Sequence, residues 1–421
     1  LHLRGDTPLT HDAPFVLNSL ELAGHTLTLQ SATTGLTVLQ ALTLGNATDR
    51  LVKNEADLIL AQPLTLAQGQ LISTGGVLRL AQGAVLEDST ELDLTATTLE
   101  FAGRLQLDNA TVTTTDATLK LLDFASLSRQ GEVSVSRLEL GEYGLELLSA
   151  DNGSSSERTH LLISEPLVVA PGSASELGQQ GIDTGSQSLT LQAAATLDSS
   201  VLHSSGGVVT LQEVVTLTNG SMDVTGGTVV FASGGSVSDL MLDNSTLVLN
   251  QDLTITEQFT TQGGEPTLQA DGGTLEVSGV ENPVHLGTSL VMNGVSTSDN
   301  TSVHLTDNVT LTRNAPFTVG SVALENHTLT LALDTTDLTI SGSVSFDNAS
   351  SGITTQGADL TLTSPLNLNN GHLSSSGGTL SLAQGVTLGD DALLDLTGTT
   401  VNLSGALDLG EGTVITDNAS A

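Results

Sequence analysis

The sequence predicts an all-β protein that folds as a parallel β-helix, or β-solenoid, with about 20 residues in each rung. Three observations carry this prediction: a long internal repeat, short segments of alternating apolar and polar residues, and an aliphatic composition with 2% aromatic residues and no cysteine. A narrow core filled by stacked aliphatic side chains leaves little room for large rings. The 38% apolar fraction is still enough for a continuous core, so the sequence does not predict disorder.

The chain repeats itself with a period of 302 residues. Residues 1–119 align without a gap with residues 303–421, and about 52 of these 119 positions are identical. For example, GGVLRLAQGAVLEDSTELDLTATT, from Gly75 to Thr98, recurs as GGTLSLAQGVTLGDDALLDLTGTT, from Gly377 to Thr400. A fold that tolerates such duplication is a stack in which each unit contacts mainly its neighbours. We therefore predict one continuous β-solenoid over residues 1–421, cut from a longer tandem array.

Within the repeat, apolar residues occur in pairs that are separated by one polar residue. Such pairs stand at Leu58/Leu60, Leu64/Leu66, Leu78/Leu80, Leu92/Leu94, Leu99/Phe101 and Leu105/Leu107. This alternation is typical of a strand with one buried face and one wet face. The spacing of the pairs predicts strands of three to five residues, and Gly-Gly, Asn-Gly and Ser-Gly between them predict tight turns. No segment has a sustained apolar period of 3.6 residues, so we expect almost no helix.

Short strands with tight turns also occur in propellers and sandwiches. A propeller blade needs about 40 residues and a sandwich about seven strands per 100 residues, and neither matches the denser strands of this chain. A β-helix with three strands in each rung fits best. At about 4.8 Å a rung, some 20 rungs would give an elongated rod of about 100 Å.

The net charge of −37 is the second strong feature of the sequence. It arises from 47 acidic and 10 basic residues, and after residue 159 the only basic residue is Arg313. Binding to phosphate requires a basic stripe, so this composition excludes nucleic acid and anionic membrane as direct partners. No apolar run approaches the roughly 20 residues that a membrane span needs, so we expect no insertion into a membrane.

Two interpretations of the acidic surface stay open. It is a solubility coat that keeps rods apart, or its carboxylates hold Ca²⁺ between neighbouring rungs, since hard cations prefer oxygen ligands. The candidate metal ligands are the acidic turns at Glu87 and Asp88 and at Asp390 and Asp391. We predict no required cofactor beyond such bridging Ca²⁺.

The segment from about Lys120 to Gln180 matches the repeat least well. It includes the polar run ADNGSSSER, from Ala150 to Arg158. We predict a loop that leaves the rod at residues 149–159, which serves either as a long turn or as a contact site.

Several phrases of the sequence resemble known repeats. SSSGGTLSLAQGVTL (Ser374 to Leu388), DVTGGTVVFASGG (Asp223 to Gly235) and QADGGTLEVSGV (Gln269 to Val280) are similar to the β-helical repeats of large secreted bacterial surface proteins. These families are the filamentous-haemagglutinin-like exoproteins and the autotransporter passengers. The resemblance implies a right-handed coil, export to the cell surface, and a role in adhesion or surface coating.

The predicted function is therefore that of a structural extracellular protein, a rod-like stalk or surface adhesin segment of a large exoprotein. An alternative is a self-assembling subunit of an extracellular filament or sheath. A third alternative is a β-helix that binds or cleaves polysaccharide. The expected partners are copies of the same chain, in contact end to end or laterally, or host and surface glycans.

The repeat also bears on catalysis. β-Helices that cleave acidic polysaccharides use Lys or Arg beside clustered carboxylates. The basic residues of the first copy, Arg4, Arg50, Lys53, Arg79 and Arg104, are replaced in the second copy by Thr, Gly, Thr, Ser and Ala. A site that depends on a cation would not be repeated without it, and no nucleophile–base pair is recognisable, so we predict that the chain is not an enzyme.

Overall fold

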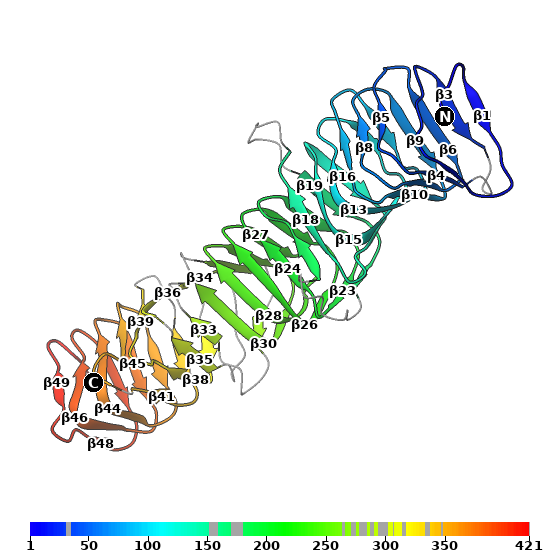
Figure 1. The fold of residues 1–421 in the computed structure, drawn as a ribbon. Coiled ribbons are helices and arrows are strands. Elements are labelled where there is room, and N and C mark those ends of the chain that lie inside the picture. The colour runs from blue at the N-terminus through cyan, green and yellow to red at the C-terminus, as the bar shows by residue number, and fades with distance from the viewer. Residues whose placement is uncertain are drawn as a thin grey trace. The chain divides into compact units, whose positions relative to one another are not determined.

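A computed structural model describes residues 1–30, 35–150, 159–169, 180–262, 266–270, 275–277, 284–286, 290–293, 302–305, 307–313, 317–332, 337–346 and 348–420. These residues form a parallel β-solenoid of about 17 turns, roughly 20 residues apart, which confirms the predicted fold class. Strands of successive turns lie beside one another (Figure 1). None of the described residues forms a helix. The chain divides into two compact units, residues 1–213 and 214–421.

Columns of leucine inside the first unit show how alternation produces this fold. Leu58, Leu78 and Leu99 occupy equivalent positions in three successive turns, and each is fully buried. The residue after each leucine, such as Arg79, faces the outside of the coil. Burying a leucine stabilises the fold by about 1.5–3 kcal/mol, so a turn becomes stable only when its neighbours cover it.

The first unit has three strands in a typical turn, one on each face of the coil. The strands of the first face are β1 (Thr7–Leu9), β3 (Thr26–Leu29), β6 (Arg50–Asn54), β9 (Gln70–Thr74), β12 (Glu91–Asp93), β14 (Thr111–Thr113), β16 (Gly131–Val135), β19 (Thr159–Ile163), β22 (Ser188–Leu191) and β25 (Val208–Leu211). The strands of the other two faces are β2 (Phe15–Leu17), β4 (Leu36–Val38), β5 (Leu42–Leu44), β7 (Leu58–Leu60), β8 (Leu64–Leu66), β10 (Val77–Leu80), β11 (Ala84–Leu86), β13 (Thr98–Gln106), β15 (Thr118–Ser128), β17 (Arg137–Glu139), β18 (Gly144–Leu148), β20 (Leu167–Val169), β21 (Gly181–Asp183), β23 (Ala195–Asp198) and β24 (Val201–Ser204).

The second unit is built in the same way. One group of its strands comprises β26 (Val215–Thr225), β28 (Gly235–Asp243), β30 (Leu253–Gln262), β32 (Leu275–Val277), β33 (Val284–Leu286), β35 (Ser302–Leu305), β38 (Ser321–Ala323) and β41 (Val344–Ser345). A second group comprises β27 (Thr228–Phe231), β29 (Thr246–Leu249), β31 (Thr267–Ala270), β34 (Leu290–Asn293), β36 (Val309–Arg313), β39 (Thr328–Leu331), β42 (Gly352–Thr355), β44 (Leu366–Ser375), β46 (Val386–Asp395), β48 (Leu407–Asp408) and β49 (Thr413–Ile415). The third group comprises β37 (Phe317–Val319), β40 (Leu338–Ile340), β43 (Leu360–Leu362), β45 (Thr379–Leu382) and β47 (Thr400–Leu403).

Acidic and amide side chains join successive turns at the corners. The Oδ1 atom of Asp57 accepts the N–H of Val77 in the next turn at 2.9 Å. In the second copy, 302 residues later, Asp359 accepts the N–H of Thr379 at 2.6 Å. The same cap joins two further pairs, Asp6 to Thr26 and Asn308 to Thr328. These caps satisfy backbone donors where the strand ladder stops, so part of the acidic composition serves the fold itself.

The strands depart from the expected lengths in one respect. Seven strands have 9 to 11 residues because each continues around a corner into the next face, and these are β13, β15, β26, β28, β30, β44 and β46. The register shifts at such corners, for example between Leu217 and Ser221. The predicted maximum of five residues is therefore wrong for these strands, because the backbone stays extended through the bend at the corner instead of ending the strand there.

Two turns of the first unit are longer than the rest. Gly131 lies opposite Thr159, and His160 lies opposite Ser188, so each of these steps takes 28 residues. The structure has about 17 turns where some 20 were expected, and the extra residues of these two turns account for less than one turn of that difference. The predicted loop at residues 149–159 falls in this region, and its residues 151–158 lie outside the described part of the chain.

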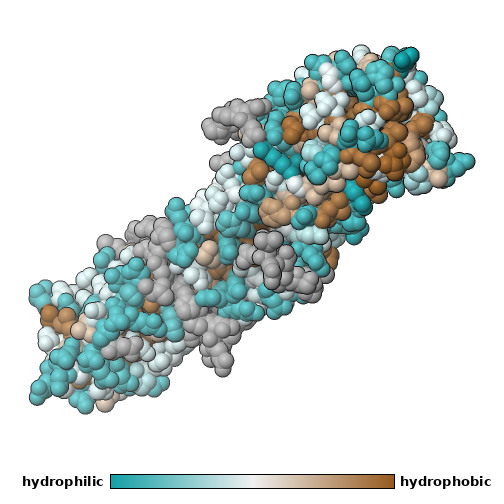
Figure 2. Space-filling model, in the orientation of Figure 1, coloured by the Kyte–Doolittle hydropathy of each residue, from teal (hydrophilic) through white to brown (hydrophobic). Residues whose placement is uncertain are grey.

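The outer surface in view is mostly hydrophilic, with an apolar area over the N-terminal turns (Figure 2). Several large apolar side chains of the first unit are exposed, among them Val16, Leu39, Val85 and Val168. Over the described ranges, we find no helix with the length and apolar character needed to cross a bilayer.

The inward phase of the strands gives a first prediction. Leu94 is 2% exposed and Val85 is 38% exposed. Leu94→Asp places an unpaired carboxylate between turns and should lower the free energy of unfolding by several kcal/mol, about 3 or more. The matched control Val85→Asp, at an outward position, should change it by about 0.5 kcal/mol. Chemical denaturation measures both, and equal losses would mean that the strand phase is wrong.

Candidate functional site

A bulge in β15 brings an aromatic side chain to the surface of the first unit. Phe101 of β13 lies opposite Leu121, and Gly103 lies opposite Ala125, so three residues of β15 face a single residue of β13. The two extra residues turn Phe124 outward, where it is 50% exposed. Phe101, by contrast, is fully buried in the core. An exposed ring gives up the stabilisation that its burial would provide, and the solenoid fold does not require a ring at this position. Phe124 is therefore a candidate contact residue.

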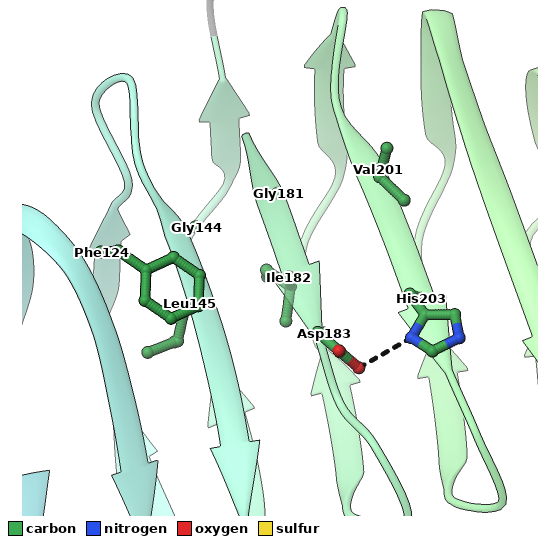
Figure 3. A pocket seen from close by; sticks show the side chains of 8 residues that line it. All are labelled: Phe124, Gly144, Leu145, Gly181, Ile182, Asp183, Val201 and His203. Carbon is green, nitrogen blue, oxygen red and sulfur yellow. Dashed lines mark hydrogen bonds and ion pairs between the residues drawn. The ribbon is translucent and has the colours of Figure 1, made fainter. Parts of the chain in front are cut away.

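Phe124 forms one wall of a surface pocket of about 190 Å³. The pocket is lined by Phe124, Gly144, Leu145, Gly181, Ile182, Asp183, Val201 and His203, which come from β15 and from strands β18, β21 and β24 (Figure 3). Gly144, Gly181 and Val201 stand opposite one another in successive turns. The first two have no side chain, so the strand backbone forms the floor of the pocket. Leu145 and Ile182 are buried beneath this floor.

Asp183 and His203 form the polar side of the pocket. The two residues face one another in neighbouring turns, and His203 Nδ1 lies 2.9 Å from Asp183 Oδ1 (Figure 3). The N–H of Gly185 donates to the same Oδ1 atom at 2.8 Å. Both contacts fall on the Oδ1 atom, so they orient the carboxylate of Asp183. The side chains of Asp183 and His203 are 47% and 37% exposed, and solvent therefore reaches the pair.

The close approach of strands β21 and β24 requires a glycine at position 181. Its φ is +145°, and a Cβ at this position would overlap the carbonyl oxygen of Val201. Any other residue would push β21 and β24 apart. The open floor of the pocket is thus a consequence of the strand geometry itself.

The sequence-predicted metal ligands lie elsewhere. Glu87 and Asp88 follow β11 and are exposed, and Asp390 and Asp391 are exposed residues of β46. Among the described residues, no group of three or more His, Asp or Glu side chains is placed to hold a metal ion. Ca²⁺ bridging at these four residues therefore stays a prediction.

Two acidic residues of the second unit do approach one another. Asp337 and Asp359 belong to neighbouring turns, where Leu338 lies opposite Leu360. Burial, together with the charge and hydrogen bond of Asp359, raises the pKa of Asp337 above its usual value. These carboxylates repel one another because the surface has few cations to neutralise them.

The first unit holds a charged ladder on its outer face. Glu100 accepts from Arg79 Nε at 2.7 Å and from Lys120 Nζ at 2.9 Å, and the three residues lie in successive turns. Burial alone would raise the pKa of Glu100, but the hydrogen bonds and charges of Lys120 and Arg79 outweigh burial and lower it. In the second copy, Ser381 and Asn402 replace Arg79 and Glu100 and keep a hydrogen bond of 3.3 Å. The ladder therefore fulfils a structural role that neutral residues also fulfil.

Lys53 is a charged residue that the coil encloses completely. It is 0% exposed, and its Nζ donates to the carbonyl oxygens of Ala56, at 2.8 Å, and of Gly75. Burial lowers its pKa to about 8, and the charge of Asp57 opposes this shift. The second copy has Thr355 at the same position, where its hydroxyl contacts that of Ser375 at 2.8 Å. Because no solvent reaches Lys53, it belongs to the core rather than to a reactive site.

The fold described above defines the chain as a parallel β-solenoid protein. Comparisons with protein-family models, curated proteins and solved structures gave no match. The resemblance to filamentous-haemagglutinin-like exoproteins and autotransporter passengers is thus supported at the level of the solenoid fold, and the particular family stays a prediction.

The pocket was not predicted from the sequence. One signal could have found it: in a chain with 2% aromatic residues, Phe124 interrupts the alternation of β15 directly after Asp123. The partners of Phe124 carry no local signal, because Asp183 and His203 lie far away along the chain and only the turn lengths bring them near it.

Lys53 gives the second prediction. Because its pKa is about 8 in the fold and 10.5 when unfolded, the unfolded chain holds the proton between these values, and stability rises as the pH rises through this window. Between pH 7 and 10.5, the free energy of unfolding of the wild-type chain should therefore rise by about 3 kcal/mol relative to that of Lys53→Thr. Denaturation at a series of pH values measures this difference. The control Val52→Thr keeps Lys53 and should keep the wild-type slope, and parallel curves for wild type and Lys53→Thr would refute the prediction.

Proposed function

We propose that the chain is a structural repeat segment of an extracellular surface protein, which acts as a stalk or as part of an adhesin. The observation that carries this proposal is the inward stacking of aliphatic residues in successive turns, as at Leu58, Leu78 and Leu99. A coil stabilised turn by turn can be lengthened by duplication without a new core. The absence of cysteine and the charge of −37 suit a long exported chain that must stay soluble.

A second candidate function is that of a subunit of a filament or sheath. Exposed apolar residues of the first unit, such as Val16 at 61% and Val168 at 67%, favour contacts with other copies. Sedimentation of the 421-residue chain over a range of concentrations separates the candidates, because a stalk stays monomeric and a filament subunit assembles.

The proposal includes no catalytic role and no nucleic-acid or membrane partner. The charged groups beside one another, such as Arg79, Glu100 and Lys120, already satisfy each other. Glycans of a host or of the cell surface remain proposed partners, together with copies of the chain itself.

The extracellular location gives the third prediction. An antibody raised against residues 35–150 should label intact cells of the source organism, and mild protease treatment of these cells should remove the labelled protein. A cytosolic marker protein serves as the control for lysis. Labelling that appears only after the cells are opened would contradict the proposal.

The acidic surface gives the fourth prediction. If Ca²⁺ bridges carboxylates of neighbouring turns, millimolar Ca²⁺ should raise the melting temperature more than NaCl does at the same ionic strength. Asp337→Asn removes one carboxylate of the pair with Asp359 and should reduce the response to Ca²⁺ but not the response to NaCl. If the two salts act equally on the wild-type chain, the surface is a solubility coat and the bridging proposal fails.

A further inference from the structure

We propose that the pocket beside Phe124 binds a small ligand that carries a primary ammonium group, such as an amino sugar or an alkylamine. The pocket belongs entirely to the first unit and depends neither on the extracellular location nor on Ca²⁺ bridging. Its two walls differ in chemistry, and the ligand class follows from both walls together.

The aromatic wall provides the first part. Phe124 is held outward by the bulge of β15, and its backbone N–H donates to the Asp123 carboxylate at 2.7 Å, which fixes the corner. The exposed face of a phenyl ring attracts a cation through its quadrupole and also contacts the C–H groups of a ligand. The solenoid core makes no use of this ring, whereas it buries Phe101, Phe231 and Phe259 almost completely.

The carboxylate wall provides the second part. Asp183 Oδ1 is occupied by His203 and by the N–H of Gly185, and Oδ2 is left for a donor in the pocket. Glu146 lies opposite Asp183 in the preceding turn, so a second carboxylate stands beside the first in the same outward column. The lining itself contains Asp183 and neither Lys nor Arg, and Glu146, just outside the lining, adds a second negative charge, which favours a ligand that brings positive charge.

The floor and the net charge complete the inference. Gly144 and Gly181 leave the space between the walls open, and the pocket of about 190 Å³ suits a single ring or a short chain rather than a larger ligand. The net charge of −37 raises the local concentration of cations and disfavours acidic ligands. A neutral sugar could contact Phe124 equally well, but it would bring no positive charge to the carboxylate of Asp183, so the ammonium group is the feature that the pocket selects.

Ligand-observed NMR of the full chain in about 0.15 M NaCl tests this proposal. The probes are glucosamine, glucose and 1,5-diaminopentane. We expect both ammonium probes to bind and glucose not to bind, and the tighter of the two ammonium probes identifies whether the natural source is an amino sugar or a linear amine. Glucose binding as tightly as glucosamine would replace the proposal with a neutral-sugar site.

Matched variants locate the binding. Asp183→Asn keeps an acceptor for the Gly185 N–H and should weaken ammonium binding by about 10- to 100-fold, and Phe124→Ala should weaken it by about 2- to 5-fold. The controls Glu213→Gln and Val168→Ala make similar changes at exposed residues outside the pocket and should have no effect. Equal losses for Asp183→Asn and Glu213→Gln would mean that the probes sense only the general negative charge, and the proposal would be overturned. Phe124→Ala alters an exposed side chain, so it tests the pocket even if Asp183→Asn unfolds.

Discussion

The fold depends on one constraint: a single turn cannot bury its own apolar side chains, so every turn must stay in register with its neighbours. The columns through Leu58, Leu78 and Leu99 are dry only because turns lie on both sides of them. Backbone ladders hold the strands in this register, and corner caps such as Asp57 to Val77 hold the segments between them. A substitution that keeps the backbone ladder and the inward column is compatible with the fold. Residues outside the core can therefore differ between the two copies.

Comparison of the two copies shows what the constraint demands of polar residues. Arg79 and Glu100 form an ion pair where Ser381 and Asn402 form a neutral hydrogen bond. Inside the coil, Lys53 donates to two carbonyl groups, whereas the threonine of the second copy contacts a serine hydroxyl. In each case the bond between turns is kept while the charge is not. The register between turns therefore depends on satisfied polar contacts and not on charged ones, so the fold is compatible with a net charge of −37.

The sequence was sufficient to predict the parallel solenoid, because a period of two within strands and of about 20 between turns leaves few other folds. It was also sufficient for the inward phase of Leu92 and Leu94, both nearly buried. The orientation of Lys53 was harder to predict. Alternation after Leu51 places its side chain inward, whereas its charge suggests an outward side chain. The side chain can lie inward because two carbonyl groups of the turns accept hydrogen bonds from it. Phe124 was the one signal of the pocket in the sequence, but its pairing with Asp183 could not be predicted, because the two residues are neighbours only through the lengths of the intervening turns.

The place of the pocket follows from the same constraint. An insertion in a strand would break the ladder and shift every inward side chain, whereas an insertion at a corner affects only outward residues. The extra residues of β15 lie at such a corner, and the register on either side of them is intact, with Leu121 opposite Phe101 and Ala125 opposite Gly103. A solenoid can therefore acquire a binding surface at the cost of a local bulge. In β15 the register shift coincides with the exposed ring of Phe124, and this is why the proposed binding site lies there.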